Sequence, residues 1–254
     1  MTYQLMKNEA PASAGKLSSP AIVIPAFNEQ ETIREVIAEV QGACSYPIYV
    51  VDDASRDSTR IVARESGAVV LPLVNQLGAW GATQAGLRFA LAKGHDAVVT
   101  MDADGQHDPA YIEQLLRPLN EGLSDVCIGS WPERGSKMRT IAWKLLRAAS
   151  GMKIEDLTSG FRAYNKRALH LLSGWKATYL EFQDVGVLAL LLQSGAQIMD
   201  TKTPMRDRQS GHSRIFQTWR IVIYYMFHSL LLGLTKRPVK RYVPNRLSVM
   251  EPTP

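Results

Sequence analysis

The sequence predicts an α/β protein whose mostly parallel sheet is flanked by helices on both faces. Short apolar runs alternate with segments of helical periodicity through the first half of the chain, and the connections between them are short. Continuous apolar runs of this kind are typical of strands that are buried on both faces. Polar and acidic clusters directly follow several of the runs. Because ligands of open parallel sheets bind beyond the carboxyl ends of the strands, these clusters mark the candidate site.

The first elements alternate strictly between strand and helix. Residues 21–24 form an apolar run that predicts a buried strand. Asn28 is predicted to cap the following helix, with Glu31 placed to complete a capping box. Apolar residues of that helix recur at helical spacing. A second strand is predicted at 47–51, and a second helix at 58–66.

The same alternation continues to the middle of the chain. A strand is predicted at 68–73, a helix at 81–93 and a strand at 97–101. A further helix is predicted to begin near Pro109, because proline suits the first helical turn. The last strand of this series is predicted at 125–129.

The second half of the chain is less regular. Residues 139–150 predict a basic amphipathic helix, 185–193 an apolar helix, and 215–234 a long helix with a wide apolar face. Basic residues directly follow the long helix, which suits the headgroup region of an anionic leaflet or a protein partner. The apolar core of that helix is shorter than the roughly 20 residues needed to span a bilayer.

The predicted organisation is one α/β domain with tails. We expect a flexible tail at 1–20, the domain at 21–214, an amphipathic membrane-interface or dimer helix at 215–243, and a tail at 244–254. The first twenty residues lack the apolar stretch of a secretory signal.

The composition indicates which binding partners and which cellular compartment to expect. The chain has 254 residues, a formal net charge of +5 and 46% hydrophobic residues, so it can bury a core and favours acidic partners. Nucleic acid is disfavoured because the basic residues form no recognisable nucleic-acid motif. Cys44 and Cys127 lack metal or redox spacing and are predicted to be reduced thiols of a cytoplasmic protein.

The most informative cluster is Asp102-Ala103-Asp104-Gly105-Gln106, which follows the strand predicted at 97–101. Two carboxylates one residue apart at the mouth of a buried strand repel each other unless a cation or hydrogen-bond donors offset their charge. A divalent metal that carries a diphosphate would do so. The cluster therefore predicts a metal site for a phosphorylated ligand.

Several motifs occur in a characteristic order, namely Pro25-Ala26-Phe27-Asn28-Glu29, Val51-Asp52-Asp53-Ala54-Ser55-Arg56-Asp57-Ser58-Thr59, Asp102-Ala103-Asp104, Gly105-Gln106-His107-Asp108-Pro109, Asp156-Leu157-Thr158-Ser159-Gly160-Phe161-Arg162 and Arg208-Gln209-Ser210-Gly211-His212-Ser213-Arg214. Together they resemble the family-two glycosyltransferases of GT-A fold. Within that family the chain resembles the dolichyl-phosphate mannose synthase group, which includes bacterial polyprenyl-phosphate sugar transferases. The resemblance covers roughly residues 21–214.

The resemblance implies a site for a nucleotide-diphosphate sugar. By this likeness, the residues that contact the nucleotide sugar are Pro25, Phe27, Glu29, Asp53, Asp102 and Ala103. Asp104 and Gln106, with Asp102 nearby, would hold the Mg²⁺ or Mn²⁺ that bridges the diphosphate, since all these ligands are oxygens. His107 is expected to be structural.

The resemblance also implies an acceptor site rich in cations. The residues expected to hold an acceptor phosphate are Arg139, Ser159, Arg162, Arg208, Ser213 and Arg214, because arginine forks match phosphate oxygens. A phosphate acceptor is already an anionic nucleophile. A sugar hydroxyl would need a base, and Asp184 lies where sugar-extending relatives place it. The expected catalytic residues are thus Asp104, Arg208 and Asp184, although Asp184 could equally cap the helix that follows.

The resemblance therefore implies an inverting hexosyltransferase that acts on a polyprenyl (dolichyl or undecaprenyl) phosphate, peripheral to the inner face of the cell membrane. The alternative is a glycosyltransferase that extends a surface glycan or lipopolysaccharide at a hydroxyl, with Asp184 as the base. A non-catalytic nucleotide-sugar binder is disfavoured because the acidic cluster and the basic loop are both intact. A homo-oligomer is left open.

Overall fold

The structure is a computed structural model that describes residues 17–131, 154, 156, 158–180 and 185–206. The strands are β1 (Pro20–Ala26), β2 (Ile48–Asp52), β3 (Val69–Pro72), β4 (Ala97–Thr100), β5 (Val126–Ser130), β6 (Arg162–Asn165) and β7 (Ile198–Lys202). The helices are α1 (Ile33–Ala43), α2 (Thr59–Glu65), α3 (Gly78–Ala92), α4 (Ile112–Asn120), α6 (Lys166–Ser173), α7 (Trp175–Thr178) and α8 (Val185–Gln193), with a 3₁₀ helix η2 at Pro109–Tyr111.

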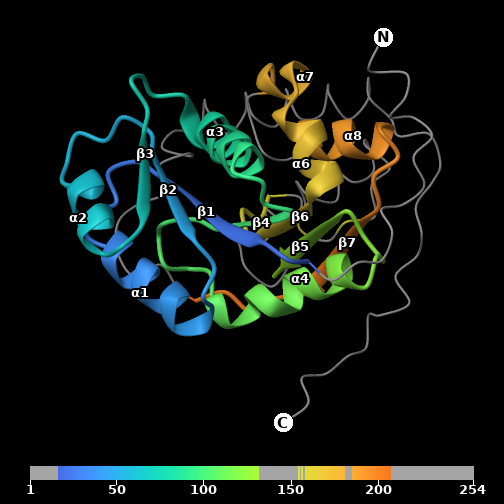
Figure 1. Cartoon of the computed structure of the whole chain (residues 1–254), viewed down its shortest axis with the longest axis horizontal. Helices are drawn as coiled ribbons and strands as arrows, with labels where there is room; N and C mark the ends of the chain where they lie inside the picture. Colours follow the sequence, from blue (N-terminus) through green and yellow to red (C-terminus); the bar gives the residue numbers. More distant parts are fainter. Residues whose placement is uncertain (1–16, 132–153, 155, 157, 181–184, 207–254) are drawn as a thin grey trace, which may run out of the picture.

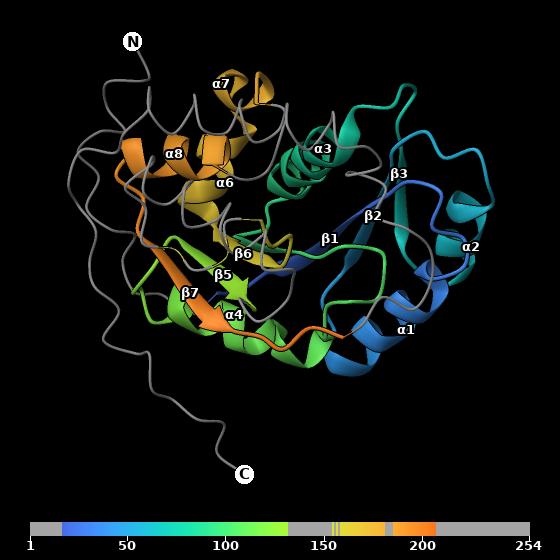
Figure 2. The same ribbon diagram turned by 180° about the vertical axis from the view of Figure 1, so that it is seen from behind.

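In the part of the chain that the structure describes, the strands form one seven-stranded sheet in the order β3-β2-β1-β4-β6-β5-β7. Neighbouring strands are parallel except around β6, which runs antiparallel to both β4 and β5. Helices cover both faces, with α1 and α4 on one side and α3, α6 and α8 on the other (Figure 1, and Figure 2 from behind). The predicted α/β class with a mostly parallel sheet is confirmed.

Two apolar cores lie on opposite faces of the sheet, because successive strand residues point to opposite sides. In β1, Ala21 and Val23 belong to the core beneath α3, α6 and α8, whereas Ile22 and Ile24 belong to the core beneath α1 and α4. All four side chains are completely buried. Full burial of an aliphatic side chain such as Ile or Val contributes about 1.5–3 kcal/mol, so these strands anchor the fold.

The site edge of the sheet is defined by the register of three strands. Thr100, the last residue of β4, pairs with Val23 of β1 and with Arg162 of β6. Because β6 is antiparallel, its first residue, rather than its last, lies at the edge where β4 ends. The segment that leads into β6 therefore reaches the same edge as the loops that follow β1, β2 and β4.

The helix after β1 begins later than the sequence predicts. α1 begins at Ile33 after Thr32, and Asn28 has a left-handed backbone with φ 54. The prediction that Asn28 caps this helix with a capping box to Glu31 is therefore wrong. The side chain of Asn28 instead accepts a hydrogen bond from the backbone N–H of Arg56, at 2.8 Å.

Other predicted elements agree with the structure to within a few residues. The helix predicted at 185–193 is α8 (Val185–Gln193). β6, α6, α7 and β7 were not predicted. Neither Cys44 nor Cys127 forms a disulfide, as expected. Within the ranges described, no helix combines the length and the apolar character needed to cross a bilayer. The predicted helices at 139–150 and 215–234 lie outside the described residues.

Candidate active site

The candidate site is formed by loops at the carboxyl ends of β1, β2 and β4 and by the segment that enters β6. Pro25 lies in β1 opposite Val51 of β2, and Phe27 and Glu29 follow in the partly exposed loop. The Glu29 carboxylate lies 3.2 Å from the Thr32 hydroxyl, which donates to the Ala103 carbonyl. These predicted donor-site residues thus come together with the acidic cluster at one edge of the sheet.

The loops after β1 and β2 are tied to one another by side-chain hydrogen bonds. The backbone N–H of Asn28 donates to Ser55 Oγ at 2.9 Å, and that of Glu29 donates to Thr59 Oγ1 at 2.7 Å. Ala54, like Asn28, has a positive φ, 59°, which is uncommon for a residue with a Cβ. The hydroxyl groups of the motif around residues 52–59 therefore hold the loop that carries Phe27 and Glu29.

The two adjacent aspartates after β2 have different roles. Asp52 is completely buried and pairs with the Arg60 guanidinium at 2.8 Å. Asp53 accepts hydrogen bonds from the backbone N–H groups of Leu77, at 2.6 Å, and Gly78, at 2.9 Å, where α3 begins. Burial raises the pKa of Asp53, and the negative charge of Asp52 raises it further. The two backbone hydrogen bonds lower this pKa but do not outweigh burial. A carboxylate can accept more than two hydrogen bonds, so contact with a base or ribose stays a prediction.

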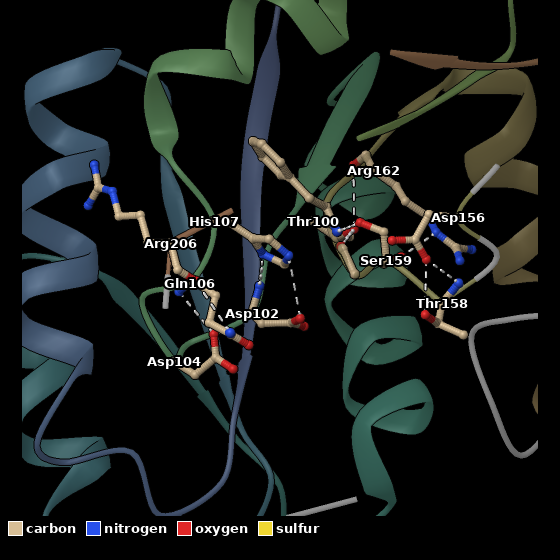
Figure 3. A network of polar contacts seen from close by, with 12 residues as sticks. Thr100, Asp102, Asp104, Gln106, His107, Asp156, Thr158, Ser159, Arg162 and Arg206 are labelled. Carbon is tan, nitrogen blue, oxygen red and sulfur yellow. Dashed lines mark hydrogen bonds and ion pairs between the residues drawn. The ribbon is translucent and has the colours of Figure 1, made fainter. Parts of the chain in front are cut away.

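The loop after β4 holds the acidic cluster (Figure 3). Asp104 is buried, with 7% of the residue exposed. Its carboxylate accepts a hydrogen bond from the Gln106 backbone N–H at 3.1 Å. The Ala103 carbonyl accepts one from the Thr32 hydroxyl at 2.7 Å. Gly105 has φ 76, a left-handed conformation that turns the loop back between Asp104 and Gln106. The cluster is thus a tight turn supported from α1.

His107 orients Asp102. His107 Nδ1 accepts the backbone N–H of Asp102 at 3.1 Å, so in the neutral ring the proton is on Nε2. Nε2 lies 3.7 Å from Asp102 Oδ2, and the ring stacks on Phe161 at a centroid distance of 5.1 Å. The structure thus places His107 between the acidic cluster and the segment that enters β6, in agreement with a structural role.

The segment before β6 packs directly against the acidic cluster. Thr100 Oγ1 donates to the Gly160 carbonyl at 2.8 Å, and the Gly160 Cα is covered by the Asp102 carboxylate. Ser159 and Arg162 are buried, and Arg162 Nε donates to the Ser159 carbonyl at 2.7 Å. The structure thus assigns Arg162 a contact within this segment. Contact of Ser159 and Arg162 with an acceptor phosphate stays a prediction.

The oxygen donors of the cluster are chemically suited to Mg²⁺ or Mn²⁺. Asp102 and Asp104 supply carboxylates and Gln106 a carboxamide oxygen, all from one loop. The described part of the chain contains no group of three or more His, Cys, Asp or Glu side chains that could enclose a metal. A cation here would take only part of its ligands from the protein, which is how Mg²⁺ commonly binds substrate phosphates.

The remaining predicted site residues lie outside the described part of the chain, namely Arg139, Asp184, Arg208, Ser213 and Arg214. The chain is described as far as Arg206, which contacts Gln106 through the backbone. Sequence reasoning did not assign Arg206, Thr32 or Thr100 to the site. The only sequence feature that pointed to Arg206 was its position at the start of the basic stretch that ends at Arg214.

The sheet, the edge loops and the oxygen-rich turn are typical of α/β proteins that bind their ligands beyond the carboxyl ends of parallel strands. Residues 21–175 match the family described as Glycosyl transferase family 2, which is more than half of the chain. The chain belongs to this glycosyltransferase family.

The chain is similar to several proteins over most of its length, including the following two. One, named polyprenol monophosphomannose synthase, from Mycolicibacterium smegmatis, is 29% identical over 226 residues, covering 82% of this chain and 84% of the relative. The other, named undecaprenyl-phosphate mannosyltransferase, from Micrococcus luteus, is 30% identical over 211 residues, covering 76% of this chain and 86% of the relative.

A solved structure confirms the fold. Glucosyl-3-phosphoglycerate synthase from Mycobacterium tuberculosis, in complex with Mn²⁺, uridine diphosphate and phosphoglyceric acid, superposes with a TM-score of 0.64 at 21% identity. The match covers 86% of this chain and 78% of that chain. The fold is GT-A-like, as the sequence predicts.

Proposed function

We propose that the protein transfers a hexose from a nucleotide-diphosphate sugar to a polyprenyl phosphate. The observation that carries this proposal is the placement of the oxygen-rich loop at residues 102–106 against the segment that enters β6, at the ligand-binding edge of the sheet. Family membership supports sugar transfer, and the names of the two relatives support the polyprenyl-phosphate acceptor.

On the donor side, Phe27 and Glu29 line the nucleobase pocket in this proposal, and Asp53 fixes the start of α3 beside it. Asp104 and Gln106, with Asp102 adjacent, would hold Mg²⁺ or Mn²⁺, and a cation there would offset the negative charge of the departing diphosphate. A neighbouring structure solved with Mn²⁺ and uridine diphosphate supports this choice of metal. His107 and Gly160 keep Asp102 in place.

On the acceptor side, a phosphate oxygen attacks the anomeric carbon as the bond from that carbon to the donor diphosphate breaks. One such displacement inverts the configuration and releases a nucleoside diphosphate. Because a phosphate is already anionic, the step needs no base. Arg208, Arg214, Ser213 and Arg139 are proposed to hold the acceptor. A hydroxyl acceptor with Asp184 as base remains the second candidate.

We propose that the enzyme acts at the cytoplasmic membrane face. Trp175 and Tyr179 in and beside α7 are 68% and 79% exposed, and Lys176 Nζ lies 6.0 Å from the Trp175 ring centroid. Exposed Trp and Tyr are enriched at membrane–water interfaces, and basic residues are attracted to anionic lipid. Trp80 of α3 donates to the Ala177 carbonyl at 2.8 Å, which fixes α7 on the domain.

The test is a transfer assay with a panel of sugar nucleotides and Mn²⁺. Each donor is offered to a short polyprenyl phosphate, to the corresponding polyprenol and to a free glycan. We expect product only with the phosphate. Product with the glycan alone would favour the second candidate, and no product with any donor would reject glycosyl transfer.

A further inference from the structure

The chain returns to the acidic cluster after β7. Met205 pairs with His107 in an isolated antiparallel bridge, and the Arg206 backbone N–H donates to the Gln106 carbonyl at 2.9 Å. These contacts join segments about a hundred residues apart in sequence, as the separation of 100 between Gln106 and Arg206 shows. The loop that carries the metal-ligand candidates thus has a backbone partner on the side of β7.

The Arg206 backbone also orients the Gln106 side chain. Gln106 Nε2 donates to the Arg206 carbonyl at 3.4 Å (Figure 3). A backbone carbonyl only accepts hydrogen bonds, so it is the NH₂ end of the amide that faces Arg206. The amide oxygen, which is the atom that could bind a cation, is bonded to the other side of the same planar group. The orientation of Gln106 therefore depends on where the Arg206 carbonyl lies.

The Arg206 side chain is held by two carboxylates. Its Nη1 lies 2.6 Å from Glu39 Oε1 on α1, and its Nη2 lies 3.3 Å from Asp108 Oδ1. Asp108 also accepts the Ala110 backbone N–H at 3.0 Å, where η2 begins. The planar, forked guanidinium can serve two carboxylates at once, whereas lysine presents a single point charge. Arg206 is thus held between α1 and the end of the acidic loop.

We propose that Arg206 is a positioning residue that acts through Gln106 on the binding of the metal and the donor diphosphate. Its ion pairs with Glu39 and Asp108 hold the carbonyl that orients the Gln106 amide. The inference rests on the proposed function only in taking Gln106 as a ligand of the metal. It does not depend on the acceptor.

A purely structural role predicts a different result. The Arg206 and Glu39 side chains are 42% and 29% exposed, and ion pairs of this kind contribute little to stability. Loss of a residue that orients a metal ligand, in contrast, weakens metal binding by about 10–100-fold in known sites. Arg206→Ala should therefore change metal binding far more than thermal stability.

The experiment measures binding rather than turnover. Calorimetric titration with Mn²⁺ in the presence of UDP, and separately of GDP, is carried out on the full chain and its variants. We expect Arg206→Ala to weaken Mn²⁺–nucleotide binding about tenfold. Glu39→Gln should also weaken this binding, but by a smaller factor. Arg206→Lys should lie between the wild type and Arg206→Ala. The melting temperature of each variant reports on folding.

Two further variants make the test decisive. Arg34→Ala removes the exposed ion pair of α1 with Glu65 and should leave binding unchanged. In a Gln106→Ala background, Arg206→Ala should have little further effect, because the group it orients is gone. Unchanged binding in Arg206→Ala, or an equal loss with and without Gln106, would overturn the inference. Failure of the wild type to bind Mn²⁺ with either nucleotide would instead reject the proposed function, and the inference with it.

Discussion

Gly160 and Asp102 lie in such close contact that a methyl group added at Gly160 would stand 2.4 Å from Asp102 Oδ1. The contact joins a residue of the predicted metal loop to one of the segment before β6. Since Thr100 also donates to the Gly160 carbonyl, the backbone of Gly160 cannot easily withdraw. The position of one loop is therefore set by the shape of the other.

Gly160→Ala should displace Asp102 and lower transfer activity. The added methyl has no room, and overpacking of this kind destabilises by about 1–3 kcal/mol. The variant should retain its circular dichroism spectrum, with reduced kcat/KM and a lower melting temperature. Gly42→Ala in α1 is the control, because nothing lies within 4 Å of a Cβ there. It should leave activity unchanged, and equal loss in both variants would contradict the role of this contact.

Asp104→Asn should weaken metal-dependent nucleotide binding and reduce turnover by at least about 100-fold, equivalent to about 2.7 kcal/mol. The amide retains an oxygen for the Gln106 backbone N–H but loses the negative charge. Binding is measured by calorimetry with Mn²⁺ and UDP or GDP, and turnover with the donor found active. Retention of both at wild-type levels would reject Asp104 as a metal ligand.

Arg162→Lys should destabilise the protein by about 1–3 kcal/mol, because a fully buried guanidinium that donates to the Ser159 carbonyl is replaced by a different donor geometry. Urea unfolding measures this change. A variant with wild-type stability and a selectively raised KM for the polyprenyl phosphate would show that Arg162 contacts the acceptor instead.

Asp96→Asn should lower stability at neutral pH but not in acid. Partial burial alone would raise the pKa of Asp96, but hydrogen bonds from Ser18 and Ser19 outweigh it and hold the pKa below its ordinary value of 3.8. A carboxylate with a lowered folded-state pKa contributes stability above the unfolded-state pKa and loses it as the pH falls through the folded-state value. The difference in unfolding free energy between wild type and variant should shrink below about pH 4.

Asp53 provides the control of opposite sign. Burial raises its pKa in the folded state, so its contribution is present at low pH and is lost as the pH rises through the raised value. As the pH rises, the unfolding free energy of the wild type should therefore fall relative to that of Asp53→Asn. If both aspartates gave the same slope, the two sets of contacts would not explain the pH dependence.

Asp184→Asn separates the two candidate acceptors. If the nucleophile is a phosphate, removal of this carboxylate should change kcat near neutral pH by less than about tenfold, because no proton has to be removed. If it is a hydroxyl, loss of the base should reduce kcat by about 10²–10⁴-fold. The measurement is the initial rate of transfer under saturating donor.

The elements that could be predicted from the sequence are those with a strong local pattern. β1 is a continuous apolar run, β4 is apolar up to its final threonine, and α8 is apolar up to its final glutamine. β6 was missed because it begins with Arg162, a charged residue that pattern reasoning does not place in a core. β7 is an edge strand, half exposed along most of its length, so its pattern is weak.

The candidate site also has features that local sequence patterns can predict and contacts that they cannot. Asp102, Asp104 and Gln106 could be expected to share one loop because they are close in sequence, and their role as metal ligands stays a prediction from the resemblance. The capping role of Asn28 was predicted from local spacing. In the structure its side chain instead accepts a hydrogen bond from the backbone N–H of Arg56, which lies in another loop. The contacts of Gly160 with Asp102 and of Arg206 with Gln106 join segments far apart in the chain, which no local pattern reports.

The reversed direction of β6 has a consequence for how such enzymes can diversify. Ser130 ends β5 and Arg162 begins β6, and both lie at the edge where β4 ends. Ser159 and Gly160, which enter β6 at this edge, are confined by the loop after β4, so they can vary between relatives only in step with that loop.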